Sequence, residues 1–168
     1  MLRGERVVLR PGRPADIDAL EAIFATPEVA AWWARFDRAR IERMVLQGED
    51  PDLTVYVIDV AGEVAGVIQS HEEQEPAYRS AGLDIAVGPR WHGTGVGLDA
   101  IRTLARHLID HGGHHRLTID PATTNERAIA AYAKVGFRPV GVVREHERGV
   151  DGTWHDGLLM DLLARELR

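Results

Sequence analysis

The sequence predicts a mixed fold of helices and strands, of the α/β or α+β class, in a single domain over residues 1–168. Three observations predict it. A chain of 168 residues has the length of one ordinary domain. Hydrophobic residues make up 45% and charged residues 27%, as in soluble globular proteins. Strand-type alternation and helix-type spacing of apolar residues succeed each other along the chain.

The N-terminal part predicts one strand and three helical segments. Residues 6–10 (RVVLR) alternate as in a strand that ends at a Pro-Gly turn. Asp16 is a candidate N-cap for a helix whose apolar residues recur at helical spacing up to Phe24. Residues 27–33 predict a further helical turn that begins at a proline, and residues 38–47 predict a third helix.

The middle of the chain predicts three strands. Residues 54–60 and 64–70 form a β-hairpin around the turn at 61–63. Residues 71–80 are polar and predict a loop or an irregular strand end. Residues 81–87 alternate between apolar and other side chains and predict the next strand.

A glycine-rich turn follows that strand and opens a helix. Gly93, Gly95 and Gly97 are spaced by two, and apolar residues recur at helical spacing over 96–109. Such a turn leaves unpaired backbone N–H groups directed at one place, where the helix dipole adds positive potential. The turn therefore predicts a ligand that carries phosphate.

The C-terminal third predicts three strands and one helix. Residues 116–119 form a buried strand, and residues 125–135 form a helix that ends at Gly136 in the left-handed cap position. Residues 137–145 and 154–163 form two further strands, which a turn connects.

Composition narrows the classes of function. The formal net charge of −6 argues against nucleic-acid binding and is compatible with a cationic substrate. The chain has no cysteine, so disulfides and cysteine nucleophiles are excluded, and we expect a cytoplasmic location. No apolar stretch reaches the ~18 residues of a membrane span, and we expect neither membrane binding nor a metal site.

Two common phosphate-binding loops do not fit the glycine turn. A P-loop requires a lysine after its last glycine, and none follows here. The dinucleotide fingerprint requires a glycine or alanine where Leu98 stands. At this point a glycine-rich turn without any ligand remains an alternative.

Two longer patterns resemble a known family. Residues 90–95 (RWHGTG) match Arg/Gln-x-x-Gly-x-Gly/Ala, and residues 125–137 (NERAIAAYAKVGF) match Asn-x-x-Ala-x-x-x-Tyr-x-x-x-Gly-Phe. With residues 139–141 and 155–160, they resemble the GCN5-related N-acetyltransferases (GNAT) over about residues 5–163. The resemblance implies a central, mostly antiparallel mixed sheet with a splayed parallel strand pair, flanked by helices. It also implies direct transfer of an acetyl group from acetyl-CoA to a primary amine.

The resemblance assigns the residues that bind acetyl-CoA. The pyrophosphate rests on backbone N–H groups of the turn, at His92, Gly93, Thr94, Gly95, Val96 and Gly97. Arg90 either adds a charged bond to a phosphate or is a solvated rim residue. The pantetheine arm pairs along the preceding strand at Ile85, Ala86 and Val87. Asn125 either contacts the pantetheine or only caps the helix that it precedes.

Tyr132 and Asp84 are the candidate catalytic residues. By the resemblance Tyr132 lies near the CoA sulfur and protonates the departing thiolate; the alternative is a half-buried tyrosine that only packs. Acetyl transfer needs a neutral amine, so another group must accept a proton. Asp84 is the candidate because a charge in an apolar strand is costly unless it has a partner or a task. Alternatively, Asp84 only forms a salt bridge on an exposed face of the strand.

Two subfamilies compete for the identity of the amine. Bacterial aminoglycoside 6'-N-acetyltransferases resemble the chain at residues 28–33, 82–85 and 119–125. Ribosomal-protein N-terminal acetyltransferases resemble it at residues 2–11 and 144–156, but those features recur in many small-molecule relatives. We expect the 6'-amino group of an aminoglycoside and a role in antibiotic resistance. A ribosomal-protein, peptide or other small-amine acceptor is the alternative, and a non-catalytic acyl-CoA-binding domain is disfavoured by the intact motifs.

The aminoglycoside resemblance implies acceptor-binding roles for Trp32, Trp33, Asp84 and Asp120. Sugar rings pack well on aromatic faces, although the paired tryptophans can also plug the core. We expect one of them to be buried and the other to line the cleft. Glu72 and Glu73 belong to an acidic run that attracts a polycation or is simply a solvated surface. The expected partner is a small cationic amine, and the expected assembly is a monomer or a homodimer.

Overall fold

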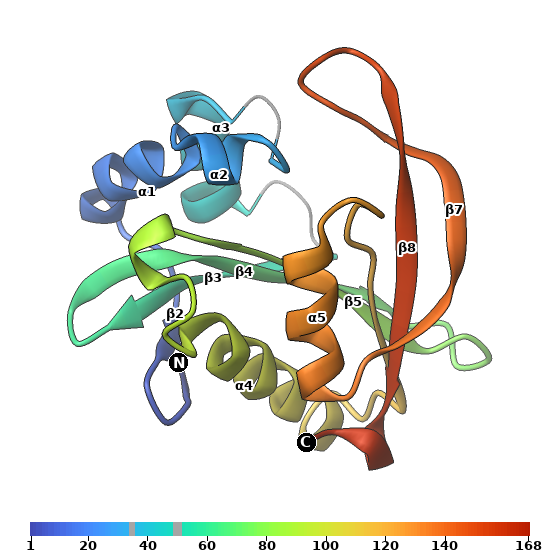
Figure 1. Cartoon of the computed structure of the whole chain (residues 1–168). Helices are drawn as coiled ribbons and strands as arrows, with labels where there is room; N and C mark the ends of the chain where they lie inside the picture. Colours follow the sequence, from blue (N-terminus) through green and yellow to red (C-terminus); the bar gives the residue numbers. More distant parts are fainter. Residues whose placement is uncertain (34–35, 49–51) are drawn as a thin grey trace.

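The computed structural model describes residues 1–33, 36–48 and 52–168, and its centre is one eight-stranded sheet. The strands are β1 (Leu2–Arg3), β2 (Val8–Arg10), β3 (Leu53–Val60), β4 (Glu63–Glu73), β5 (Ser80–Val87), β6 (Arg116–Ile119), β7 (Arg138–Arg148) and β8 (Trp154–Leu163). They lie in the order β1-β2-β3-β4-β5-β6-β8-β7. Neighbouring strands are antiparallel except β5 and β6, which are parallel. This mixed sheet confirms the predicted fold class (Figure 1).

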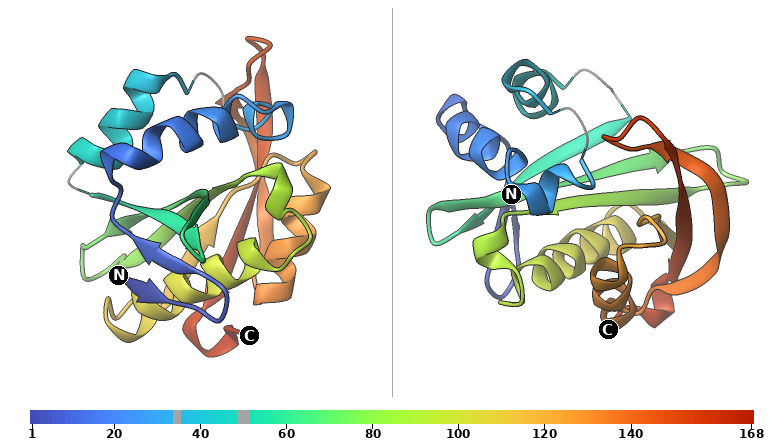
Figure 2. Two further views of the ribbon diagram at one scale, coloured as in Figure 1. Left: turned by 90° about the vertical axis from the view of Figure 1, so that its left-hand side faces the viewer. Right: turned by 45° about the horizontal axis from the view of Figure 1, so that its top comes forward.

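Helices cover both faces of the sheet. They and the shorter helical turns are η1 (Pro14–Asp16), α1 (Ile17–Phe24), α2 (Pro27–Ala30), α3 (Arg38–Glu42), η2 (Arg43–Gln47), η3 (Pro89–Trp91), α4 (Val96–Asp110), α5 (Glu126–Val135) and η4 (Ala164–Glu166). Helices α4 and α5 lie on one face, and α1, α2 and α3 lie on the other (Figures 1 and 2). Within the described ranges, no helix has both the length and the apolar character of a membrane span.

The two faces bury separate apolar cores. Successive strand residues point to opposite faces of a sheet, so Ile68 packs toward α4 and α5 whereas its neighbour Val67 packs toward α1. Strand β5 divides in the same way, with Leu83 in the first core and Ala86 in the second. Packing therefore holds both faces of β5, and it also sets the directions in which Asp84 and Ile85, which lie between Leu83 and Ala86 in the strand, point.

Several predicted boundaries differ in the structure. Strand β4 continues to Glu73, because the polar residues 71–73 pair with the start of β5 although no apolar alternation marks them. The predicted helix 38–47 is divided into α3 and the π-helical segment η2. Strand β7 extends to Arg148 and is exposed along most of its length, so its apolar pattern did not mark its end. The two-residue strand β1 was not predicted.

Asp16 occupies the predicted N-cap position of α1, but its carboxylate has other partners. It accepts two hydrogen bonds of 2.8 Å from the buried Arg10 guanidinium and one of 2.7 Å from the backbone N–H of Arg13. The hydrogen bonds from Arg10 are the main reason why the pKa of Asp16 is lowered. The carboxylate therefore joins β2 to the start of the helical layer.

Strands β5 and β6 diverge after a very short contact. Only Ala81 and Gly82 of β5 pair with β6, although β5 continues to Val87. Beyond β6 the chain turns toward β8, where Pro121 accepts a 2.7 Å hydrogen bond from the N–H of Leu158. A bridge between Ala122 and Gly157 holds the same segment. The divergence leaves one edge of β5 without a neighbouring strand within the described structure.

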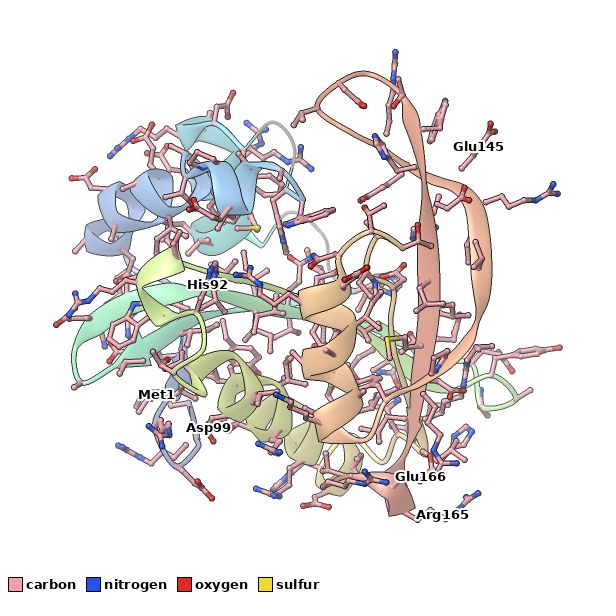
Figure 3. All side chains as sticks on the ribbon, in the orientation of Figure 1. Met1, His92, Asp99, Glu145, Arg165 and Glu166 are labelled. Carbon is pink, nitrogen blue, oxygen red and sulfur yellow. The ribbon has the colours of Figure 1, made fainter. Side chains whose placement is uncertain are left out.

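Asp99 ties the N-terminal hairpin to α4. Its buried carboxylate accepts backbone N–H groups from Glu5, Arg6 and Val7 at 3.1, 2.7 and 3.0 Å. Figure 3 shows Asp99 at the N-terminal end of α4, beside this hairpin. Since α4 begins at the glycine turn, the same contact braces that turn.

We predict that Asp99→Ala lowers the free energy of unfolding by about 2–4 kcal/mol, because three backbone donors lose their acceptor. Asp110→Ala is the matched control, since Asp110 lies at the other end of α4 and is exposed. We expect that control to change stability by at most about 0.5 kcal/mol. Urea denaturation at pH 7 measures both, and equal effects would contradict the bracing role.

Candidate functional site

A cavity of about 890 Å³ opens where β5 and β6 diverge. Its lining comes from β5, the glycine turn, α2, α5, the segment after β6 and the end of β7. This volume lies within the range of ligand sites in proteins. The cavity therefore joins elements that are far apart in the sequence, and the glycine turn and Asp84 both line it.

The glycine turn presents free backbone donors to this cavity. Gly93 and Gly95 have φ values of +73° and +89°, in the region that favours glycine. Gly95 is the N-cap of α4, and the first N–H in the helix with an acceptor is that of Asp99, which bonds Gly95 O at 3.0 Å. The N–H groups of residues 95–98 therefore lack partners within the helix. They suit an anionic ligand.

The structure differs from the prediction at His92 and Thr94. The N–H of His92 donates to Pro89 O at 3.1 Å and that of Thr94 to Trp91 O at 3.4 Å, because residues 89–94 form tight turns. These two N–H groups are already engaged within the turn.

The His92 ring instead connects two walls of the cavity. Nδ1 accepts from Arg127 Nη1 at 2.6 Å, and Nε2 therefore donates to Val87 O at 2.8 Å. Figure 3 shows His92 near the turn that precedes α4, to the left of α5. The ring thus joins the end of β5 to α5.

Arg90 does not take the predicted place beside the phosphate site. Its guanidinium pairs with Glu63 at the start of β4, lies 4.9 Å from the centre of the Trp91 ring and does not line the cavity. The side chain is 71% exposed, which is what a solvated rim residue would show. Arg127 and Lys134 of α5 line the cavity instead. They are seven residues apart on one helix, which is the spacing that could have identified them.

The residues expected along the pantetheine arm line the cavity. Ile85, Ala86 and Val87 do so on the open edge of β5, where Val87 O already accepts from the His92 ring. Asn125 also lines the cavity, and its Oδ1 accepts from Ala128 N at 3.2 Å. It is thus the N-cap of α5, and its contact with pantetheine stays a prediction.

Tyr132 is buried in the wall of the cavity, with 8% of its surface exposed. Burial raises its pKa well above the ordinary value of tyrosine, and Asp84 and Asp120 raise it further. The phenol is therefore neutral near pH 7 and is able to donate its proton. Its ring also packs at 6.3 Å from the ring of Phe137, so it contributes to the core as well.

Asp84 lies on β5 opposite Gln69, whose Nε2 donates to Asp84 Oδ2 at 3.0 Å. The carboxylate is open to solvent in the cavity, yet protein atoms surround it closely enough to raise its pKa by desolvation. Asp120 and Glu147 raise this pKa further, whereas Gln69 and His146 lower it. No ion-pair partner of Asp84 occurs among the described residues.

The two tryptophans are both half-buried and both line the cavity, so the expectation of one buried and one lining is wrong. Trp33 packs edge-on against Phe24 and Phe36, at 5.6 and 5.2 Å between ring centres. This aromatic cluster anchors Trp33 while it remains open to the cavity. Trp32 lies beside it on the same wall.

The acidic residues of the cavity are only partly those predicted. Asp120 lines it, and its Oδ2 lies 2.6 Å from His146 Nε2. Glu28 and Glu147 also line it and were missed: Glu28 opens the stretch 28–33, in which only the tryptophans were singled out, and Glu147 stands in no pattern that marks a site. No cluster of three or more metal-ligating side chains occurs in the described ranges.

Glu72 and Glu73 do not line the cavity, contrary to their predicted role in binding the acceptor. They belong to the far end of β4, opposite Ala81 and Ser80, because that strand is longer than predicted. Glu72 Oε2 lies 2.6 Å from Nε2 of the buried His114, and Glu73 Oε1 accepts the N–H of Glu75. Both carboxylates are engaged locally.

The comparisons with known proteins agree with this geometry. Residues 6–138 match the family model described as the acetyltransferase (GNAT) domain. The aminoglycoside N(6')-acetyltransferase type 1 of Klebsiella pneumoniae is 27% identical over 157 residues, which cover 83% of this chain and 77% of that protein.

Two solved structures share the fold over nearly all of the chain. The aminoglycoside acetyltransferase AAC(6')-Ib, in complex with coenzyme A and kanamycin, has a TM-score of 0.77 at 25% identity, over 95% of this chain and 96% of that one. The spermidine N-acetyltransferase from Vibrio cholerae, in complex with CoA and spermine, has a TM-score of 0.80 at 19% identity, over 96% and 97%. The second likeness shows the shared fold alone.

We predict that Gly95→Asp weakens the binding of coenzyme A by at least about tenfold, because a carboxylate would stand where the free N–H groups attract phosphate. Gly62→Asp is the matched control, since Gly62 has the same φ of +89° in a hairpin turn outside the cavity. Isothermal titration calorimetry with coenzyme A measures both. Unchanged affinity in the Gly95 variant would reject the phosphate site.

Proposed function

The chain belongs to the GNAT family of acetyltransferases, and we propose that this acetyl-CoA-dependent N-acetyltransferase acts on the 6'-amino group of an aminoglycoside. One observation carries the proposal. Four carboxylates and two tryptophans line the same cavity as the glycine turn: Glu28, Asp84, Asp120, Glu147, Trp32 and Trp33. An acceptor with several ammonium groups and sugar rings suits such a wall.

Acetyl-CoA supplies the acetyl group as a thioester and binds along the other walls of the cavity. The N–H groups of residues 95–98 hold the pyrophosphate, and Arg127 and Lys134 add positive charge beside them. The pantetheine arm follows the open edge of β5, where it takes the place of a neighbouring strand. These contacts direct the thioester toward Asp84 and Tyr132.

One residue accepts a proton during the acetyl transfer, and another donates one. Asp84 accepts a proton from the acceptor ammonium, whose nitrogen keeps the electron pair and forms the bond to the acetyl carbon. Tyr132 donates its phenolic proton to the sulfur as the carbon–sulfur bond breaks. The raised pKa values support this division, since a carboxylate with a raised pKa is a stronger base and the phenol is protonated at neutral pH.

A second acceptor class has an observation in its favour. Arg40 and Arg148 also line the cavity, and cations there suit an amine that carries a carboxylate, such as a peptide. The aminoglycoside acceptor is preferred because four carboxylates oppose these two cations and because two of the relatives named above are aminoglycoside acetyltransferases.

A panel of amines tests the proposal directly. Thiol release from acetyl-CoA is measured with kanamycin, spermine, amino acids and peptides with free N-termini. We expect the highest kcat/KM for kanamycin, with the product acetylated at the 6' nitrogen by NMR. Reaction with peptides alone would replace the proposal with the second acceptor class.

We predict that Asp84→Asn lowers kcat by about a hundredfold without changing the melting temperature, because the amide cannot accept the proton. In the wild type, kcat should fall as the pH falls through the raised pKa of Asp84, since only the ionised form is a base. Glu73→Gln is the control, an exposed carboxylate outside the cavity. Wild-type kcat in the Asp84 variant would exclude this base.

A further inference from the structure

A histidine pairs with Asp120 of the acceptor wall, and the mechanism above assigns this histidine no role. His146 Nε2 lies 2.6 Å from Asp120 Oδ2, and both side chains are about one-third exposed. Asp120 lines the cavity, and His146 is close enough to Asp84 to lower its pKa. Asp120 thus shares the cavity with Asp84, the carboxylate that accepts the proton, and His146 lies within electrostatic reach of it.

A bulge in β7 lies at His146, which contacts Asp120. The pairing with β8 advances from Val143 to Glu147 on β7 but only from Gly157 to His155 on β8, so β7 bulges here. Glu145 takes a φ of +50° at the bulge, and its N–H donates to Asp156 Oδ1 at 2.8 Å. Figure 3 shows Glu145 on the outer side of the hairpin.

The position of the His146 imidazole also depends on Gly157, which has no side chain. A Cβ built on Gly157 would lie 2.7 Å from His146 Cδ2 and 3.2 Å from its Cβ. The ring therefore lies on the bare backbone of β8, and any larger residue at this position would displace it. Gly157 also forms the bridge to Ala122, two residues after Asp120, so one glycine sets the positions of both partners.

We propose that His146 is a positioning residue that holds Asp120 toward the acceptor ammonium and makes acceptor affinity depend on pH. A neutral imidazole donates Nε2–H to one carboxylate oxygen and leaves the pair with one negative charge that attracts the ammonium. A protonated imidazole neutralises that charge. The proposal rests on the acceptor role of Asp120 and not on which amine is the substrate.

The groups around His146 agree with this arrangement. Asp120 contacts it from the segment after β6, Asp84 of β5 interacts with it electrostatically, and Glu147 follows it on β7. Asp156 of β8 is engaged with the Glu145 N–H. These side chains surround the ring with negative charge, and a proton bound by the ring neutralises part of it.

KM and kcat as functions of pH test the proposal, with the best amine of the panel as the probe. Between pH 8 and pH 6 the wild-type KM should rise by roughly three- to tenfold, the loss of one nearby opposite charge. His146→Gln keeps an N–H donor but cannot be protonated, so its KM should be close to the wild-type value at pH 8 and should lose this rise. His146→Ala should have a raised KM throughout, with kcat little changed.

Two further variants separate this role from a general effect on the hairpin. Gly157→Ala should reproduce the KM of His146→Ala, because it displaces the ring without removing it. His155→Gln should behave as the wild type, since His155 forms a similar pair with Asp151 at 3.0 Å outside the cavity. Titration of the acceptor amine itself also changes KM with pH, but this change is the same for all variants.

The results that would overturn the role of His146 differ from those that would overturn the proposed function. A wild-type dependence of KM on pH in His146→Gln, or a wild-type KM in His146→Ala, would overturn the role of His146. If another amine replaces kanamycin as the best acceptor, the aminoglycoside proposal fails while the His146 experiment proceeds with that amine. If no amine of the panel is acetylated, calorimetry of kanamycin and spermine binding at pH 8 and pH 6 gives the same comparison, and equal pH dependence in wild type and His146→Gln rejects the proposal.

Discussion

The separation of β5 from β6 after two paired residues is the constraint on which the site depends. Parallel strands normally continue side by side, but the chain beyond β6 is held to β8 by the Pro121–Leu158 hydrogen bond and the Ala122–Gly157 bridge. Backbone groups of β5 are left without a strand partner along this edge, and an extended ligand can supply one. The cavity opens at this divergence, and the glycine turn and α5 form two of its walls.

Contacts between distant segments keep the walls of the gap in place. Asp99 joins α4 to the N-terminal hairpin through three backbone donors, and His92 joins the end of β5 to Arg127 of α5. Such contacts matter because the free N–H groups of the turn bind an anion only when they converge on one point. Strand β5 is itself fixed by apolar residues on both of its faces.

Charge is divided within the cavity. Free N–H groups, Arg127 and Lys134 make one part positive, whereas Glu28, Asp84, Asp120 and Glu147 make another part negative. Burial keeps Tyr132 protonated and makes Asp84 a stronger base, so one proton donor and one proton acceptor share the cavity at neutral pH. This division suits the proposed acyl transfer from an anionic carrier to a cationic amine.

The sequence by itself determined the features that depend on neighbours along the chain. Alternation in residues 81–87, the glycines at 93–97 and the glycine at 136 predicted strand β5, the turn that opens α4 and the end of helix α5, because local periodicity and backbone geometry decide them. Only the tertiary structure decided which long side chains meet. Arg90 turns to Glu63, Glu72 turns to His114, and His146 reaches Asp120, each across 26 residues or more. A flexible side chain takes its partner from the packing of distant elements, and sequence spacing does not carry that information.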